Sequence, residues 1–204
     1  MRILVTGASG FVGRALTCAL SQAGLPVRAA ARNLSAIPVA ANIEAVMLPD
    51  LAQPVDWRPL IRDVDAIVHL AGIAHAKNVS EAQFDRANRL ATKELVLAAS
   101  MAPNIRRMVF VSSIRAQSGP ACDHVLTEGD PPQPTDAYGR SKLAAEAFVR
   151  GYGVQFVRGA GPGAAVPTMA SRRCRGGSRC CLRRILQRRA VPAGRYTLPP
   201  AASS

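Results

Sequence analysis

The sequence predicts an α/β fold, a doubly wound parallel sheet with flanking helices, and two observations carry that prediction. The first is the N-terminal stretch MRILVTGASGFVG, where a short apolar run is followed by spaced glycines and then by residues with helical spacing. The second is the alternation of apolar runs with helical segments throughout residues 1–158. Strands separated by helices pair in parallel, because a parallel connection needs such a crossover.

The N-terminal stretch is expected to form a strand, a glycine turn and a helix. Residues 3–5 form an apolar run typical of a strand that is buried on both faces. Gly7 and Gly10 have no Cβ atom, so their backbone can approach a pyrophosphate, and Gly13 lets the helix pack closely on the strand. We therefore expect a phosphate-binding loop rather than a plain tight turn. One face of the expected helix, which Gly24 ends, carries Val12, Leu16, Ala19, Leu20 and Ala23.

The second strand bears on the choice of cofactor. It covers Val27 to Ala31 and ends at Arg32, 19 residues after Gly13, and no carboxylate lies between Val27 and Asn42. In a dinucleotide fold, an acidic residue at this place binds the ribose hydroxyls of NAD, whereas an arginine accommodates the 2′-phosphate of NADP. The sequence favours NADP. NAD stays as the alternative, with Arg32 as a solvated loop residue.

The remaining elements follow in alternation. Further strands are expected at residues 43–48, 65–71, 107–111 and 154–158, and helices at residues 57–61, 80–100 and 137–150. His69 ends the fourth strand and is expected to be packed rather than catalytic, while His75 in the next loop could face a substrate. Two interpretations of Asn88 stay open. It is either a buried side chain with its hydrogen bonds met near the active site, or an exposed helix residue.

A tyrosine and a lysine stand four residues apart at the start of the helix at residues 137–150. Tyr138 and Lys142 therefore project from one face. A phenol has a pKa near 10, and a neighbouring ammonium together with a positive nicotinamide ring would favour the phenolate. Lowering that pKa by about three units takes about 4 kcal/mol. Ser113, at the end of a strand 25 residues upstream, would donate a hydrogen bond to the substrate oxygen.

Composition limits the other classes of function. The 204 residues, 49% of them apolar, are enough for one good core, and no apolar run reaches membrane-spanning length. The N-terminus is expected to be a strand without a signal-peptide cleavage region, so we expect a cytoplasmic protein. The five cysteines do not suggest a disulfide framework. We expect no metal site, because Cys174, Cys180 and Cys181 fit no zinc-binding spacing.

Together these motifs resemble the extended short-chain dehydrogenase/reductase family, and within it the NAD-dependent epimerase/dehydratase group that acts on nucleotide sugars. The matching segments are TGASGFVG at 6–13, DL at 50–51, HLAG at 69–72, FVSS at 110–113 and DAYGRSK at 136–142, and the loop and helix at 127–146 are also typical. The resemblance covers residues 1–158 and implies a Rossmann fold.

The resemblance also implies site residues and a reaction. Ser113, Tyr138 and Lys142 would be catalytic, with Ser112 as the alternative serine, because Ile114 stands where several relatives carry a third serine. Tyr138 would take the proton from a sugar hydroxyl while hydride passes to the nicotinamide. The alternatives are a non-catalytic dinucleotide-binding remnant and an NADP-dependent carbonyl reductase. The cofactor-binding set would be Thr6, Gly7, Gly10, Phe11, Val12, Gly13, Arg32, Asp50, Leu51, Leu70, Ala71, Gly72, Asn88, Tyr138 and Lys142.

The resemblance implies partners as well. The substrate would be a nucleotide sugar, and the helices that flank the sheet could form a homodimer. We expect no membrane partner.

The pattern stops after residue 158. Residues 158–204 hold ten arginines and no acidic residue, a net charge of +10, whereas residues 1–157 hold 16 basic and 13 acidic residues, a net charge of +3. Relatives continue here into a C-terminal domain that binds the sugar nucleotide. This chain has instead a mixture of arginine, cysteine, glycine and proline without period, which we expect to be disordered over 159–204.

A shifted reading frame would explain this tail. Permitted codons for residues 187–201, read one base later, can encode Ser-Gly-Val-Pro-Phe-Pro-Leu-Gly-Ala-Ile, which resembles a segment that many relatives have in this region. The competing interpretation is a basic tail that binds nucleic acid. It is disfavoured, because the arginine-rich segment has no aromatic residue for stacking before Tyr196 and no recognised module.

Overall fold

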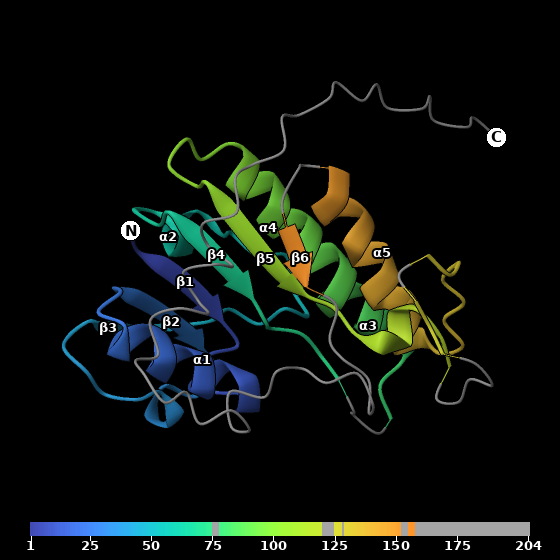
Figure 1. Ribbon diagram of the computed structural model, residues 1–204, viewed down its shortest axis with the longest axis horizontal. Coiled ribbons are helices and arrows are strands. Elements are labelled where there is room, and N and C mark those ends of the chain that lie inside the picture. Colours follow the sequence, from blue (N-terminus) through green and yellow to red (C-terminus); the bar gives the residue numbers. More distant parts are fainter. Residues whose placement is uncertain (75–77, 120–124, 128, 152–154, 158–204) are drawn as a thin grey trace.

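The computed structural model describes residues 1–74, 78–119, 125–127, 129–151 and 155–157. Within them lies a six-stranded sheet with the strand order β3-β2-β1-β4-β5-β6, and all of its pairings are parallel (Figure 1). The expected α/β fold with a doubly wound sheet is confirmed. His75, the three clustered cysteines and the whole basic tail lie outside the described residues. The strands are β1 (Ile3–Thr6), β2 (Val27–Ala31), β3 (Ile43–Met47), β4 (Ala66–His69), β5 (Arg107–Val111) and β6 (Gln155–Val157).

The strand order changes direction next to β1. The chain moves from β1 outward to β2 and β3, then crosses back to β4 on the other side of β1. Thr6, the last residue of β1, therefore has Ala30 of β2 and His69 of β4 as its neighbours. In open parallel sheets, ligands bind at the carboxyl ends of the strands where the order reverses. The fold thus places the glycine turn at this edge.

Helices cover both faces of the sheet. One core cluster is formed with α2, α4 and α5, and its largest fully buried side chains include Trp57 and Phe110. A smaller cluster around Ile3, Val5 and Leu20 lies under α1 on the opposite face. The helices are α1 (Phe11–Gln22), α2 (Arg58–Ile61), α3 (Glu81–Phe84), α4 (Ala91–Ser100) and α5 (Ala137–Gly151).

The buried face of α1 differs from the expected one. Gly13, Thr17 and Leu20 are buried, whereas Val12 is 54% exposed and Ala23 is also exposed. The expectation that Val12 and Ala23 share the core face was wrong. Small residues determine the contact, because the helix start approaches the preceding loop so closely that only glycine fits at position 13. Leu20 is then the large apolar anchor of the helix.

The long helix expected at residues 80–100 is not a regular α-helix. Ser80 caps its start in a reciprocal capping box with Gln83, and α3 then passes into a π-helical stretch, η2 (Asp85–Leu90), before α4 begins. Apolar spacing does not reveal this stretch, and it contains Asn88. Two short 3₁₀ turns, η1 (Leu34–Ala36) and η3 (Ile114–Ala116), were also not expected.

Within the described ranges, no helix is both long and apolar enough to cross a membrane. The same ranges contain no cluster of histidine, cysteine, aspartate and glutamate that could hold a metal ion.

Candidate active site

The glycine turn leaves no room for side chains. Gly7 has φ +70°, and a Cβ atom there would lie 2.9 Å from the amide nitrogen of Ala71. A Cβ atom on Gly13 would lie 2.1 Å from the carbonyl oxygen of Gly7. Two glycines are therefore required by contacts inside the protein: Gly7 packs on the turn after β4, and Gly13 brings α1 onto the loop. The loop is held between β1, β4 and α1.

Gly10 caps α1 without a side-chain hydrogen bond. The first helical bond runs from the amide of Arg14 to the carbonyl of Gly10, so the amides of the first turn point out of the helix end. Phe11 is 89% exposed, and no acidic residue stands in this turn. Outward amides and the positive end of the helix dipole suit an anion. The geometry fits the pyrophosphate of a dinucleotide.

The residues expected at the adenosine end take different positions. Arg32 directly follows β2 and is exposed. Asp50 is also exposed, and its Oδ1 accepts a hydrogen bond from the amide of Ala52. Leu51 is 8% exposed and belongs to the core, so its side chain is packed away from this surface.

The turn after β4 is fixed by the hydroxyl of Thr6. Its Oγ1 accepts hydrogen bonds from the amides of Leu70 and Ala71, both at 3.2 Å. Gly72 follows, and a Cβ atom there would lie 2.7 Å from Oδ1 of Asn88. Ala71 therefore lies against the glycine loop, and Gly72 lies against Asn88.

Asn88 is buried, with 2% of its surface exposed. Its Oδ1 accepts from the amide of Ile73 at 2.8 Å, and its Nδ2 donates to the carbonyl of Ile73 and to Oγ of Ser141, both at 3.0 Å. The exposed interpretation was therefore wrong, and the buried one is correct. Every hydrogen of the amide group is used inside the protein, so Asn88 joins the turn after β4 to α5.

Tyr138 and Ser113 meet at the end of β5. Ser113 is close enough to the Tyr138 hydroxyl to lower its pKa, and the ring of Phe84 lies 5.9 Å from that of Tyr138. Ser113 also accepts from the amide of Arg115 at 3.2 Å. Ser112, the alternative serine, donates instead to the buried carboxylate of Glu146 at 2.6 Å. The structure thus brings Ser113, not Ser112, to the tyrosine.

Lys142 lies one turn further along α5 and is 7% exposed. Its Nζ donates to the carbonyl of Val111 at 2.7 Å and lies 4.0 Å from the centre of the Phe110 ring. Burial lowers the pKa of Lys142 from 10.5 to about 7. The π-face of the ring and one carbonyl stabilise an ammonium less than water does, so the charged form of Lys142 is disfavoured.

The pKa of Tyr138 differs from the expectation. Burial raises it above the ordinary value of 10.0, and Asp136 raises it further, while the hydrogen bond from Ser113 and the charge of Arg115 lower it less. Lys142 was expected to lower it, but its Nζ is engaged with Val111. The charges of the described residues alone therefore do not favour the phenolate.

His69 is packed, as expected. Its ring is fully buried between Trp57, edge-on at 5.8 Å, and Phe110, stacked at 5.9 Å. Burial and the nearby Lys142 lower the pKa of His69 from 6.5 to about 3, so the ring is neutral at neutral pH. Three residues that contact side chains of the site were not foreseen. Thr92 lies 3.2 Å from Nε2 of His69, Phe110 lies against Lys142, and Glu146 accepts the hydrogen bond from Ser112. Glu146 stands four residues after Lys142 on the same helix, and that spacing could have indicated it.

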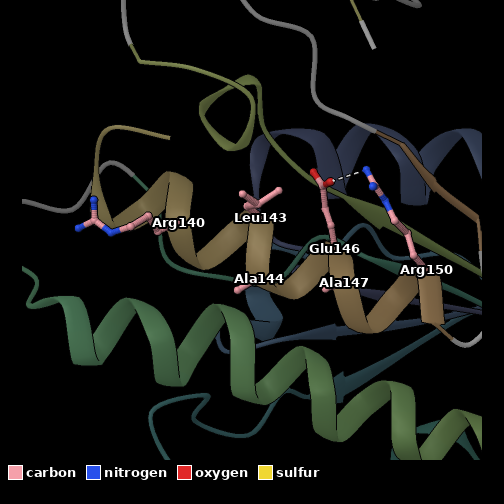
Figure 2. A pocket seen from close by; sticks show the side chains of 6 residues that line it. All are labelled: Arg140, Leu143, Ala144, Glu146, Ala147 and Arg150. Carbon is pink, nitrogen blue, oxygen red and sulfur yellow. Dashed lines mark hydrogen bonds and ion pairs between the residues drawn. The ribbon is translucent and has the colours of Figure 1, made fainter. Parts of the chain in front are cut away.

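A separate hollow of about 310 Å³ lies along α5, away from Tyr138 and Lys142. Figure 2 shows the side chains that line it and the ion pair between Glu146 and Arg150. Nη2 of Arg150 lies 3.0 Å from Oε2 of Glu146. The lining residues are Arg140, Leu143, Ala144, Glu146, Ala147 and Arg150. It is a feature of the helix surface and not the dinucleotide site.

Known proteins share this arrangement. Residues 3–161 match the model of the NAD dependent epimerase/dehydratase family. A ketoreductase of Stigmatella aurantiaca, which acts on 4-hydroxy-2-methyl-3-oxo-4-farnesyl-3,4-dihydroquinoline-1-oxide, is 34% identical over 73% of this chain and 45% of its own length. A UDP-glucose 4-epimerase of Azospirillum brasilense is 30% identical over 74% of this chain and 44% of its own. The chain thus spans about half the length of the curated relatives it matches.

Solved structures agree with the sequence matches. A short-chain dehydrogenase/reductase superfamily protein from Agrobacterium tumefaciens with bound NAD superposes with a TM-score of 0.67 at 30% identity, over 78% of this chain and 48% of that one. MoeE5 in complex with UDP-glucuronic acid and NAD gives the same TM-score at 29% identity, over 78% of this chain and 53% of that one. The family match covers most of the chain, and the glycine loop and the Tyr138 helix lie where the sequence resemblance implied. The chain belongs to the NAD dependent epimerase/dehydratase family.

Proposed function

We propose that this chain carries the dinucleotide-binding and catalytic half of an enzyme that transfers hydride between NAD(P) and a carbinol of a nucleotide sugar. The observation that carries the proposal is the approach of Ser113 to Tyr138, one helical turn before the buried Lys142, at the sheet edge that also holds the glycine loop. Relatives named as UDP-glucose 4-epimerase and as dTDP-6-deoxy-L-talose 4-dehydrogenase support a sugar nucleotide as the substrate.

Each residue has one role in this proposal. Ser113 holds the substrate oxygen, and Tyr138 takes the hydroxyl proton as the C–H hydride leaves. Lys142, with a pKa of about 7, carries a partial positive charge at neutral pH and is the group that can favour the phenolate when it leaves Val111. The glycine loop and the start of α1 would hold the pyrophosphate. A bound dinucleotide would supply the hydride acceptor.

We propose NADP as the preferred cofactor, because Arg32 is exposed at the end of β2 and can reach a 2′-phosphate. Fluorescence titration of the chain should show tighter binding of NADP than of NAD, and Arg32→Ala should remove the difference, roughly tenfold in affinity for one charge-assisted contact. Arg106→Ala is the matched control, since Arg106 is exposed just before β5, at the opposite sheet edge, and should leave both affinities unchanged. Equal or tighter binding of NAD by the native chain would contradict the NADP preference.

The remaining expectations belong to the same proposal. Residues 1–158 would form the dinucleotide-binding domain, and residues 159–204 would be a basic tail produced by a shifted reading frame. A homodimer through the flanking helices also belongs to the proposal, and sedimentation equilibrium would measure it. We also place the protein in the cytoplasm, which cell fractionation would test. The second candidate function is a remnant that binds the dinucleotide without turnover, favoured by the raised pKa of Tyr138 and by the hydrogen bond that holds Lys142 on Val111.

A further inference from the structure

A buried chain of hydrogen bonds crosses the protein beneath the proposed dinucleotide site. It begins at Thr6, at the end of β1, whose Oγ1 lies 2.7 Å from Nδ1 of His69. The other ring nitrogen, Nε2, lies 3.2 Å from Oγ1 of Thr92. Thr92 in turn donates to the carbonyl of Asn88 at 2.5 Å. All four side chains are at most 2% exposed, so water does not compete for these bonds.

The direction of each bond follows from counting protons and lone pairs. The hydroxyl of Thr6 accepts the backbone amides of Leu70 and Ala71, the former shared with the Thr6 carbonyl at 3.3 Å, and its own proton is then best donated to Nδ1 of His69. The hydroxyl of Thr92 gives its single proton to Asn88, so it can only accept from Nε2. The Thr92 end requires the neutral tautomer of His69 with the proton on Nε2, and the Thr6 end fits the same tautomer. A proton added to Nδ1 would compete with the two backbone amides for the lone pairs of the Thr6 hydroxyl.

The chain continues from Asn88 to the helix that carries the reactive tyrosine. The Nδ2 group of Asn88 donates to Oγ of Ser141, which donates to the carbonyl of Tyr138 at 2.7 Å. At the other end, Thr6 holds the turn on which Gly7 packs, since a Cβ atom on Gly7 would lie 2.9 Å from the amide of Ala71. The bonds therefore run from the glycine loop to α5.

Resting on the proposed function, we propose that His69 is a positioning residue: its Nε2–H tautomer completes a directed hydrogen-bond chain that fixes the glycine loop relative to Tyr138. Without the acceptor on Thr92, the ring can change tautomer or turn, and Thr6 then loses its fixed orientation toward the turn after β4. Fewer molecules would hold the binding-competent loop, and the apparent dinucleotide affinity would fall by that fraction. Because a fully satisfied buried network is rigid, removing one hydroxyl should be felt at both ends.

The variant that tests this is Thr92→Val, which removes the hydroxyl but keeps the shape. Thr17→Val is the matched control, because Thr17 is also fully buried in a helix and its Oγ1 has no hydrogen-bond partner among the described residues. Titration of the full chain with NAD and NADP should show about tenfold weaker binding for Thr92→Val, as for one lost buried hydrogen bond. Thr17→Val should bind as the native chain does, and Thr92→Ser should restore binding.

A second measurement does not depend on binding. Long-range ¹H–¹⁵N correlation spectra of the native chain, which has three histidines, should show His69 with its proton on Nε2, assigned by its disappearance in His69→Gln. A proton on Nδ1, or equal affinities of Thr92→Val and Thr17→Val, would overturn the inference. If the native chain binds neither NAD nor NADP, the proposed function fails on its own, and the tautomer still decides whether the directed chain exists. If Thr92→Val does not fold, the tautomer of His69 in the native chain still decides whether the directed hydrogen-bond chain exists.

Discussion

Single residues at this site are tuned by burial more than by charge. Lys142 has neighbours that can hold an ammonium but solvate it poorly, one carbonyl and one aromatic face. Arg28 shows the contrasting solution, because its buried guanidinium is paired with Glu44 at 3.0 Å and also donates to two backbone carbonyls. An arginine keeps its charge when buried, whereas a lysine in a dry position changes its pKa.

This tuning predicts how stability depends on pH. The unfolded chain keeps Lys142 protonated up to its ordinary pKa of 10.5, while the folded chain releases the proton above about pH 7. Between these values the unfolded state binds more protons, so the folded state gains stability as the pH rises, by at most about 1.4 kcal/mol per pH unit. Below pH 7 the group contributes no pH dependence.

Urea unfolding at pH 7, 8 and 9 would measure this effect against Lys142→Met. The free energy of unfolding of the native chain should rise relative to that of the variant over this range. Parallel curves for the two proteins would mean that Lys142 keeps an ordinary pKa in the folded state, and the burial argument would then fail.

Among the elements, α1 shows most directly how a local contact sets the site. Gly13→Ala would put a Cβ atom 2.1 Å from the carbonyl oxygen of Gly7 and 2.8 Å from Cα of Ala8, and backbone atoms cannot move away cheaply. We expect a loss of about 2–3 kcal/mol of stability and loss of dinucleotide binding, because α1 must tilt off the loop. Thermal unfolding and cofactor titration would measure both.

Gly151→Ala is the control for this substitution. Gly151 ends α5, and an added Cβ atom there would meet nothing within 4 Å. The variant should be unchanged or more stable by up to about 1 kcal/mol, since alanine is the better helix former. Similar losses in the two variants would show that α1 does not depend on the close contact at Gly13.

The sequence predicted elements better than the interactions between them. Strands such as β1 and β5 produce apolar runs, and glycine spacing marks the loop, so both could be predicted from the local sequence. The π-helical stretch η2 and the partner of Lys142 could not, because they depend on which backbone groups meet after folding. The sequence likewise placed Asn88, a polar residue, within a helix, but it did not predict that its side chain bonds both Ile73 and Ser141.

At the scale of the whole molecule, the two faces of the sheet are unequally covered. Met108 and Phe110 of β5 are buried beneath α4 and α5, while Val109 and Val111, which alternate to the other face, are only partly buried. The helix on that side, α1, contacts β1 and β2 instead. Under the frame-shift proposal, the segment read in the restored frame completes the fold over these half-covered valines.

A chain with the reading frame restored after residue 158 tests this completion together with the chemistry. If the tail is a frame-shifted product, the restored protein should cover the face of Val109 and Val111, bind less of a hydrophobic dye such as anilinonaphthalene sulfonate than the 204-residue chain, and turn over a nucleotide sugar.

Tyr138→Phe in the restored protein should leave dinucleotide binding nearly intact and lower kcat by about 10²–10⁴, because the proton acceptor is removed while the loop is untouched. Ser112→Ala is its control, since Ser112 donates to Glu146 and not to Tyr138, and it should change kcat far less. Near-normal turnover by Tyr138→Phe would mean that another group is the base. Nucleotide-sugar turnover by the 204-residue chain itself would show that the segment after residue 158 does not impair the enzyme, and the frame-shift proposal would then be wrong.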